Sequence, residues 1–348
     1  MEEAKARNPA IKLYGLPWSF PQFVACAPGA GLNCSGAGPW TLINQTARYV
    51  SAWAAGARDA HNLTIDVLGI WNERTAGDDY VQALRAHLDA EQLATKILVW
   101  DNWITADPPG ADIAGVHYPG IGGGNPSLDF PMWSSEESST YNNDVGGGCW
   151  ARVVNQNYVA NNMTASLCWN LVASYMKATN WYRTGLMTAL QPWSGSFGTF
   201  AKDGSWTAGA MVWATAHTTQ FSSADGSWAY LAAGDSSTRS GAGLLPNGGS
   251  YVTLKNFASG DFSVVVEKMS RAHSSCVRPT PPDFVTLAED VTSRCAAGSR
   301  PPGRWRSGAR TGRSTTRTRR PSSSASRTSR SARTAPSCCA SRSTRSTR

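Results

Sequence analysis

Two apolar runs in this sequence end on carboxylates. The first, over 65–70, is followed by Asn72-Glu73, and the second, over 130–133, is followed three residues later by Glu136. A carboxylate at the end of a buried strand is costly to desolvate, so two of them suggest paired functional groups at one end of a sheet. Glycosidic bond cleavage needs such a pair, because one acid protonates the departing oxygen and one carboxylate meets the positive anomeric carbon. We predict Glu73 and Glu136 as the catalytic residues.

Asn72 stands directly before the first of these carboxylates. An amide at this strand end can hydrogen-bond the sugar 2-hydroxyl, a contact that strengthens in the transition state. For a single Glu, a role in helix capping or in a surface ion pair is the simpler explanation. The recurrence of the pattern on two predicted parallel strands favours catalysis instead.

Short apolar runs alternate with stretches of helical periodicity, which predicts helices over 46–61 and from Asp78 or Asp79 to about Leu93. This βαβα order implies a parallel sheet with helical crossovers. An open doubly wound sheet and a (β/α)8 TIM barrel both satisfy it. No Gly-rich phosphate turn follows any run, and polar and aromatic residues at successive strand ends favour the barrel. The six predicted strands are 11–16, 65–70, 96–100, 113–117, 130–133 and 167–173.

A closed barrel needs eight strands, so we expect an incomplete α/β barrel that lacks two strands on its N-terminal side. After residue 221 the pattern changes to short alternating runs between Gly-, Ser- and Asp-rich turns, which is typical of an antiparallel sheet. We therefore divide the chain into a partial TIM-barrel catalytic domain over 1–224, a β-sandwich segment over 225–293 and a low-complexity Arg/Ser-rich tail over 294–348.

The formal net charge of +8 comes from the tail, which holds fifteen Arg and no Asp or Glu; the preceding 293 residues carry −7. With almost no aliphatic residues, the tail cannot bury enough apolar surface to offset its ordering entropy, and we expect it to be disordered. A nucleic-acid arm is one explanation. A stretch without an evolved role, from a shifted reading frame or a wrong gene model, is the other, and we favour it because no recognition motif accompanies the arginines.

Four Asn-x-Ser/Thr triplets and eight cysteines without metal-ligand spacing favour an oxidising, secretory route. No signal peptide or membrane-spanning run is present, so we expect that a signal peptide was lost by truncation. We predict no metal site and no cofactor, because no His/Cys/Asp cluster has ligand spacing along the sequence. The triplets begin at Asn33, Asn44, Asn62 and Asn162.

Seven collinear segments between about Glu3 and Pro279 closely resemble the galactosylceramidase family of glycoside hydrolases. The resemblance implies a (β/α) barrel with a β-sandwich and retaining hydrolysis of the β-galactosyl bond of galactosylceramide. A retaining enzyme holds its two carboxyl groups roughly 5–5.5 Å apart. The segments are Leu13–Pro21, Gly69–Arg74, Trp133–Glu136, Gly148–Trp150, Trp169–Tyr175, Pro192–Gly195 and His217–Phe221.

The resemblance also implies roles for individual residues. Glu73 matches the general acid/base and Glu136 the nucleophile, while Asn72 and Trp18 match positions that contact the galactose. The other matched residues are Arg278, which reaches the sugar site from the sandwich, Trp169, which lines that site or is an ordinary core residue, and Cys149 with Cys276, which form a disulfide.

The sequence also departs from the family. The first barrel strands and the C-terminal lectin-like domain have no counterpart, and Glu137 replaces an Asp that follows the nucleophile in a family member. A second carboxylate beside Glu136 can raise the pKa of one of the pair. The segment 26–38 diverges and allows a local Cys26–Cys34 bridge.

Further polar residues follow two other predicted strands. For these we predict supporting roles behind the catalytic pair rather than substrate contacts; they are Asp101-Asn102 and His117-Tyr118.

We therefore predict a truncated β-galactosidase that hydrolyses galactosylceramide to galactose and ceramide, in the lysosome or secretory pathway. The resemblance implies a glycosphingolipid substrate and a helper protein that presents the lipid; we expect no nucleic-acid partner. Two alternatives stay open. One is a related barrel β-glycosidase that acts on a soluble glycoside, and the other is a catalytically inert fragment or carbohydrate-binding protein.

Overall fold

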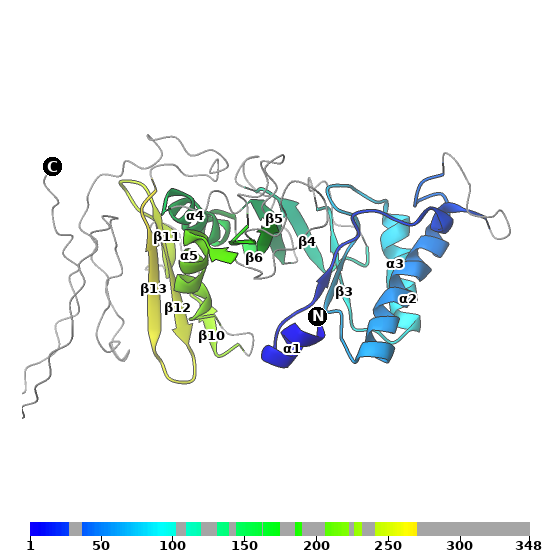
Figure 1. The fold of residues 1–348 in the computed structure, drawn as a ribbon, viewed down its shortest axis with the longest axis horizontal. Coiled ribbons are helices and arrows are strands. Elements are labelled where there is room, and N and C mark those ends of the chain that lie inside the picture. The colour runs from blue at the N-terminus through cyan, green and yellow to red at the C-terminus, as the bar shows by residue number, and fades with distance from the viewer. Residues whose placement is uncertain are drawn as a thin grey trace, which may run out of the picture.

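Six strands form a parallel sheet in which each strand pairs with the next one along the chain (Figure 1). The computed structural model describes residues 1–27, 37–101, 109–119, 131–138, 144–161, 163–174, 185–189, 206–222, 226–231 and 241–269. The strands of this sheet are β1 (Tyr14–Gly15), β2 (Val67–Gly69), β3 (Lys96–Val99), β4 (Ile113–His117), β5 (Met132–Ser138) and β6 (Met163–Trp169).

The strand order decides between the two architectures that the sequence allows. A doubly wound sheet reverses its strand order at a switch point, whereas the strands of a barrel follow one another in sequence. The observed order runs from β1 to β6 without a reversal, and every neighbouring pair is parallel. Six strands are fewer than the eight that close a barrel, so the described residues confirm the predicted incomplete (β/α)8 barrel.

The sheet is strongly curved. Tyr14 of β1 and Trp133 of β5 have ring centroids 6.3 Å apart. In a flat sheet, strands four positions apart would lie about 19 Å from each other. Trp18, just after β1, stacks on Trp169 at the end of β6 with a centroid distance of 6.1 Å. The first and last strands therefore approach each other at their carboxyl ends, as the wall of a partial cylinder does.

Helices cover the outer face of β1 to β3 (Figure 1). Helix α2 (Ile43–His61) and helix α3 (Asp78–Ala90) bury one side each, and their apolar residues join those of the strands in the largest core cluster. The inner face of the sheet holds a second, smaller cluster of Val67, Leu98 and Ile113, against which Tyr14 and Trp133 pack. Two short elements precede α2: helix α1 (Glu2–Arg7) and the 3-10 helix η1 (Gln22–Ala25).

Strand boundaries differ from the prediction in three places. Strand β1 has two residues where the sequence suggested six, and β5 runs to Ser138, so Glu136 lies within the strand rather than beyond its end. The predicted sixth strand over 167–173 is wrong: β6 begins at Met163 and ends at Trp169, and the following strand belongs to another sheet. Polar residues that line the inner wall of a barrel break an apolar run, so the run alone misplaces these ends.

A three-stranded sheet follows β6. Strand β7 (Val172–Ser174) pairs in parallel with β8 (Met187–Ala189), which pairs antiparallel with β9 (Trp206–Ala208). Helix α5 (Ala210–Thr219) packs on helix α4 (Asp144–Asn161), and Trp150 donates a hydrogen bond from Nε1 to Thr215 Oγ1 at 2.7 Å. Gly147 permits this close approach, because a Cβ there would lie 3.0 Å from that of Ala210.

An antiparallel sheet ends the described chain, as the alternating runs predicted. Strands β10 (Trp228–Tyr230) and β11 (Ala242–Leu244) pair with successive parts of β12 (Ser250–Asn256), and β13 (Phe262–Glu267) pairs with β12 along most of its length. This sheet lies beside α4 (Figure 1). There Tyr158 of α4 stacks on Tyr230 with a centroid distance of 4.5 Å. The predicted domain boundaries stay predictions, and the tail over 294–348 lies outside the described residues.

Candidate active site

The turn that carries Asn72 and Glu73 is held from two sides. The Asn72 N–H donates to the carbonyl of Pro17 at 2.9 Å, which ties the turn after β2 to the turn after β1. The Trp71 ring packs edge-on against Phe20 and Trp40, with centroid distances of 5.4 and 5.5 Å. These contacts fix the backbone at the carboxyl end of β2, while the Glu73 side chain itself is 58% exposed.

Glu136 reaches the same end of the sheet because β5 is irregular. Its pairing with β6 shifts register between Ser134 and Glu137, as at a β-bulge. In a regular strand, consecutive side chains point to opposite faces. Here Ser135 donates to Asp101 at 2.5 Å, and Glu136 Oε1 accepts a hydrogen bond from the Tyr118 hydroxyl at 2.5 Å. The bulge thus lets two successive residues serve one site, a common use of this irregularity.

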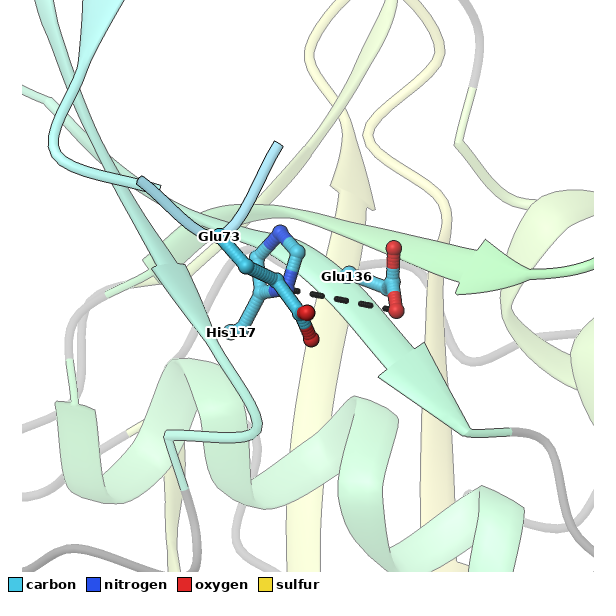
Figure 2. A group of neighbouring side chains, drawn as sticks. All are labelled: Glu73, His117 and Glu136. Carbon is cyan, nitrogen blue, oxygen red and sulfur yellow. Dashed lines mark ion pairs between the residues drawn. The ribbon is translucent and has the colours of Figure 1, made fainter. Parts of the chain in front are cut away.

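Glu73 and Glu136 converge on His117, which lies at the end of β4 (Figure 2). His117 Nδ1 is 3.6 Å from Glu73 Oε1 and 3.9 Å from Glu136 Oε1. A carboxylate oxygen of each Glu and a ring nitrogen of the His all lie within 4.8 Å of one another. The carboxylate oxygens are therefore nearer to the roughly 5–5.5 Å of retaining glycosidases than to the 6.5–9.5 Å of inverting ones.

Asp101 lies behind this group and connects it. Its carboxylate is fully buried and lies 2.9 Å from His117 Nε2. The same carboxylate accepts hydrogen bonds from the Ser135 hydroxyl and, at 3.2 Å, from the backbone N–H of Glu73. Asp101 thereby touches residues that follow or belong to β2, β4 and β5. The predicted supporting role of Asp101 and His117-Tyr118 agrees with these contacts; Asn102 lies outside the described residues.

Burial and charge shift the protonation of two of these groups. Burial lowers the pKa of His117, but Asp101, Glu136 and Glu73 outweigh it, so the pKa of the imidazole is raised. Burial raises the pKa of Glu136, and the charges of Glu73 and Asp101 add to this effect. The hydrogen bond from Tyr118 and the charge of His117 work in the opposite direction. His117 therefore favours the ionised form of the carboxylate beside it.

Left-handed backbone is concentrated at the site. Glu73, Trp100, Asp101 and Tyr118 have φ of +52°, +79°, +39° and +48°, and all four follow β2, β3 or β4. Residues with a Cβ rarely adopt such angles, which cost on the order of 1 kcal/mol or more each and persist only where the surroundings enforce them. Strained residues of this kind cluster at functional sites.

The predicted substrate-binding residues are only partly described. Asn72 Oδ1 is buried and has no hydrogen-bond partner among the described residues, as expected of an acceptor that a sugar hydroxyl would satisfy. Trp18 is 56% exposed and stacks on the half-buried Trp169, so these two predicted residues lie together. Arg278 lies outside the described residues, and its role stays a prediction.

Two of the described cysteines form disulfides with partners outside the described residues. Cys149 and Cys26 are each disulfide-bonded. Their predicted partners, Cys276 and Cys34, lie outside the described residues, so the pairings stay predictions. Cys168 is a free thiol.

Glu137 follows Glu136 in β5, but its side chain contacts helix α4. It is 2% exposed, and its Oε1 accepts a hydrogen bond from Asn157 of α4 at 3.3 Å. Burial, with a smaller contribution from the charge of Glu136, raises the pKa of Glu137 to about 7. The charge of the adjacent carboxylate therefore contributes to the shift at Glu137, but burial is its main cause.

Glu137 gives a stability prediction with a defined sign. Its folded pKa of about 7 lies above the unfolded value, so its contribution is complete below about pH 4 and is lost as pH rises through 7. Between pH 5 and pH 8 the free energy of unfolding should fall by on the order of 2 kcal/mol more in the parent chain than in Glu137→Gln. Urea unfolding at several pH values, in buffer with EDTA, measures this difference. An equal pH dependence in both proteins would contradict it; the exposed Glu91→Gln is the control.

Tyr118 gives an activity prediction. Its hydroxyl donates to Glu136 Oε1, and a hydrogen bond to a charged group contributes about 1.5–3 kcal/mol. Tyr118→Phe should therefore lower kcat for a glycoside substrate by roughly 10- to 100-fold, with a much smaller change in KM. Steady-state kinetics with thermal unfolding as a folding check test this. An unchanged kcat would mean that Tyr118 does not orient Glu136.

The two predicted catalytic carboxylates and His117 could also hold a cation. Glu73, His117 and Glu136 each offer one possible ligand atom. The prediction of no metal site rested on spacing along the sequence, but these residues are far apart in the chain and meet only because β2, β4 and β5 end at one edge of the sheet. The only sequence signal for such a cation site is a polar residue near the end of each of these strands.

Comparison with known proteins finds two family models that match this chain. Residues 1–220 match the model of glycosyl hydrolase family 59, and residues 238–297 match the central domain of that family. The chain is 41% identical over 296 residues to the galactocerebrosidase of Danio rerio, covering 82% of this chain and 41% of that protein. It is 42% identical over 305 residues to the galactocerebrosidase of Salmo salar, covering 84% and 42%.

Among solved structures, the fold resembles a conserved exported protein from Bacteroides fragilis with a TM-score of 0.50 and 14% sequence identity, over 74% of this chain and 68% of that one. At this identity the likeness concerns the fold alone. The chain spans about two fifths of the length of the two curated relatives. Since the family model covers more than half of its residues, the chain belongs to glycosyl hydrolase family 59.

Proposed function

We propose that this chain carries the catalytic centre of a retaining β-galactosidase that hydrolyses galactosylceramide to galactose and ceramide. The observation that carries the proposal is the approach of Glu73 and Glu136, whose carboxylate oxygens lie within 4.8 Å at the carboxyl end of a curved parallel sheet. The identity to galactocerebrosidases, 41% and 42% for the two relatives above, supports the substrate class.

Glu136 is the nucleophile in this proposal. It is the more buried of the pair, and its Oε1 is held by Tyr118, so its orientation is fixed. A Glu136 oxygen attacks the anomeric carbon while the bond to the ceramide oxygen breaks and Glu73 gives that oxygen its proton. Glu73 then takes a proton from water, the water oxygen attacks the anomeric carbon, and the bond to Glu136 breaks. Galactose leaves with its β configuration retained.

His117 is a positioning residue in the same proposal. Its ring lies between the two carboxylates and its Nε2 contacts the buried Asp101. A positive imidazolium here attracts both carboxylates and limits their mutual repulsion, which would otherwise separate them. Its charge also favours the ionised form of Glu136, which is the form that attacks.

The substrate can be tested against the soluble-glycoside alternative. Release of galactose from galactosylceramide in detergent micelles should exceed release of sugar from glucosylceramide and from lactose, all measured with the full chain. A higher rate with lactose would favour the soluble substrate. If none of the three is hydrolysed, the inert-fragment alternative holds; if galactosylceramide is hydrolysed by the parent chain and not by Glu136→Gln, that alternative is rejected.

We further propose a lysosomal or secretory location and a helper protein that presents the lipid. The disulfide-bonded Cys26 and Cys149 support an oxidising route, because disulfides persist mainly there. Two of the predicted glycosylation triplets begin at exposed residues, Asn44 and Asn62. No helix among the described residues is both long and apolar enough to cross a bilayer.

A further inference from the structure

Glu73, His117 and Glu136 present three donor atoms to one small space (Figure 2). The donors are two carboxylate oxygens and one imidazole nitrogen, and they come from three different strands or strand ends. Divalent zinc is bound in proteins by these ligand types, often with three protein ligands and a fourth position left to water or substrate. The donor set is therefore one that a transition-metal ion can use.

His117 points to a ligand independently of the carboxylates. Its side chain is only 5% exposed, and neither ring nitrogen makes a hydrogen bond of good geometry among the described residues, although Nε2 lies 2.9 Å from Asp101 Oδ1. Both carboxylate oxygens that face Nδ1 lie beyond hydrogen-bond distance, at 3.6 and 3.9 Å. A buried nitrogen of this kind is costly unless something binds it. In the free protein, a proton on Nδ1 that both carboxylates attract can satisfy this nitrogen. A bound metal ion can satisfy it instead.

Asp101 lies where a metal-bound histidine needs support. A histidine that ligates a metal through one nitrogen almost always gives its other N–H to a carboxylate, carbonyl or water, which fixes the ring. Asp101 Oδ1 is 2.9 Å from His117 Nε2 and is itself held by Ser135 and by the Glu73 N–H. This arrangement leaves Nδ1 facing the two carboxylates.

The distances require only a small adjustment. With metal–ligand bonds of about 2.0–2.2 Å, tetrahedral donors lie about 3.4 Å apart. The distances of 3.6 and 3.9 Å from Nδ1 are close to this value. The remaining separation can close through Glu73, whose side chain is 58% exposed.

We propose that Glu73, His117 and Glu136 bind one divalent transition-metal ion such as Zn²⁺, and that this ion competes with the glycoside. Two carboxylates and a neutral imidazole balance the charge of the ion, which displaces the proton of His117 to solvent. Because the ion occupies the space between the two carboxylates, the anomeric carbon of a sugar cannot enter. The competition rests on the proposed function, but the binding of metal does not.

Titration of the EDTA-treated, dialysed full chain with Zn²⁺ by calorimetry, and with Co²⁺ by visible absorption, tests the site. We expect one ion per chain, with the visible bands of four-coordinate Co²⁺. His117→Gln should abolish binding, and Asp101→Asn should weaken it by about 10- to 100-fold, as loss of an outer partner does. Glu73→Gln, at a side chain that is 58% exposed, should weaken binding at least about tenfold. His61→Gln, an exposed histidine, is the matched control and should bind as the parent chain does.

The proposal is overturned if the parent chain binds no ion, or if Glu73→Gln and His117→Gln both bind as tightly as the parent chain. It is also overturned if His61→Gln removes the signal. Binding is measured without substrate, so its outcome is separate from the proposed activity. If the chain binds Co²⁺ as expected but releases no galactose, the metal site stands and the glycosidase assignment fails. If the chain releases galactose but does not bind Zn²⁺, the glycosidase assignment stands and the metal site fails.

Discussion

Glu136→Gln is expected to lower kcat for galactosylceramide by at least about 10⁴-fold, while the free energy of unfolding stays close to that of the parent chain. Gln keeps the size of the side chain and an oxygen that can accept the Tyr118 hydrogen bond, but its amide cannot form the glycosyl ester. Kinetics in mixed micelles with thermal unfolding in parallel measure both quantities. The exposed Glu91→Gln removes a carboxylate elsewhere and should leave kcat unchanged.

A shortened side chain adds a second readout for the same residue. Glu136→Ala leaves a space beside Tyr118 into which a small anion such as azide can enter. Azide should restore cleavage of an activated galactoside by attacking the anomeric carbon from that side, which gives the α-galactosyl azide as product. Retention of more than about 1% of the parent kcat by Glu136→Gln, or formation of the β-azide by Glu136→Ala, would contradict the role of Glu136 as nucleophile.

Glu73→Gln is expected to lower kcat for galactosylceramide by roughly 10²- to 10⁴-fold, the usual effect of a general acid. The ceramide oxygen is a poor leaving group without a proton, whereas nitrophenolate leaves without one. With a nitrophenyl galactoside the first step should therefore remain fast in this variant. The second step should be slow, because water loses its general base, and a burst of nitrophenol should precede a slow steady state.

The dependence on leaving group separates chemistry from structure for Glu73. Its side chain is exposed, so the variant is expected to fold as the parent chain does. Stopped-flow absorbance gives the burst amplitude, which should approach one per chain. An equal loss of rate for both substrates, without a burst, would show that Glu73 does not act as the acid/base.

The sequence predicts the inner part of the fold well. All six runs that we assign to the parallel sheet contain residues of its strands, although the sixth run overlaps only the end of β6. The errors lie at β1, which is shorter than its run, and at β5 and β6, where the inner wall of the barrel turns polar near the site. Functional residues replace apolar ones there, so the pattern that marks a strand stops before the strand does. The separate sheet of β7 to β9 depends on contacts between distant residues, which periodicity does not record.

The site was predictable in its residues but not in its connections. Carboxylates after strand ends identify Glu73 and Glu136, and polar residues at two further ends identify Asp101 and His117. That Asp101 accepts hydrogen bonds from Ser135 and from the Glu73 backbone depends on the bulge in β5 and on left-handed backbone at 73 and 101. Neither feature has a sequence signal, because none of these positions is glycine.

The stereochemistry of the released sugar tests the pairing of Glu73 and Glu136 most directly. Proton NMR of galactose during the first minutes of hydrolysis, before mutarotation, identifies the anomer that forms first. Two carboxylates whose oxygens lie within 4.8 Å leave no room for a water molecule behind the sugar, so β-galactose should appear first. The appearance of α-galactose first would contradict the double displacement and the assignment of Glu136 as nucleophile.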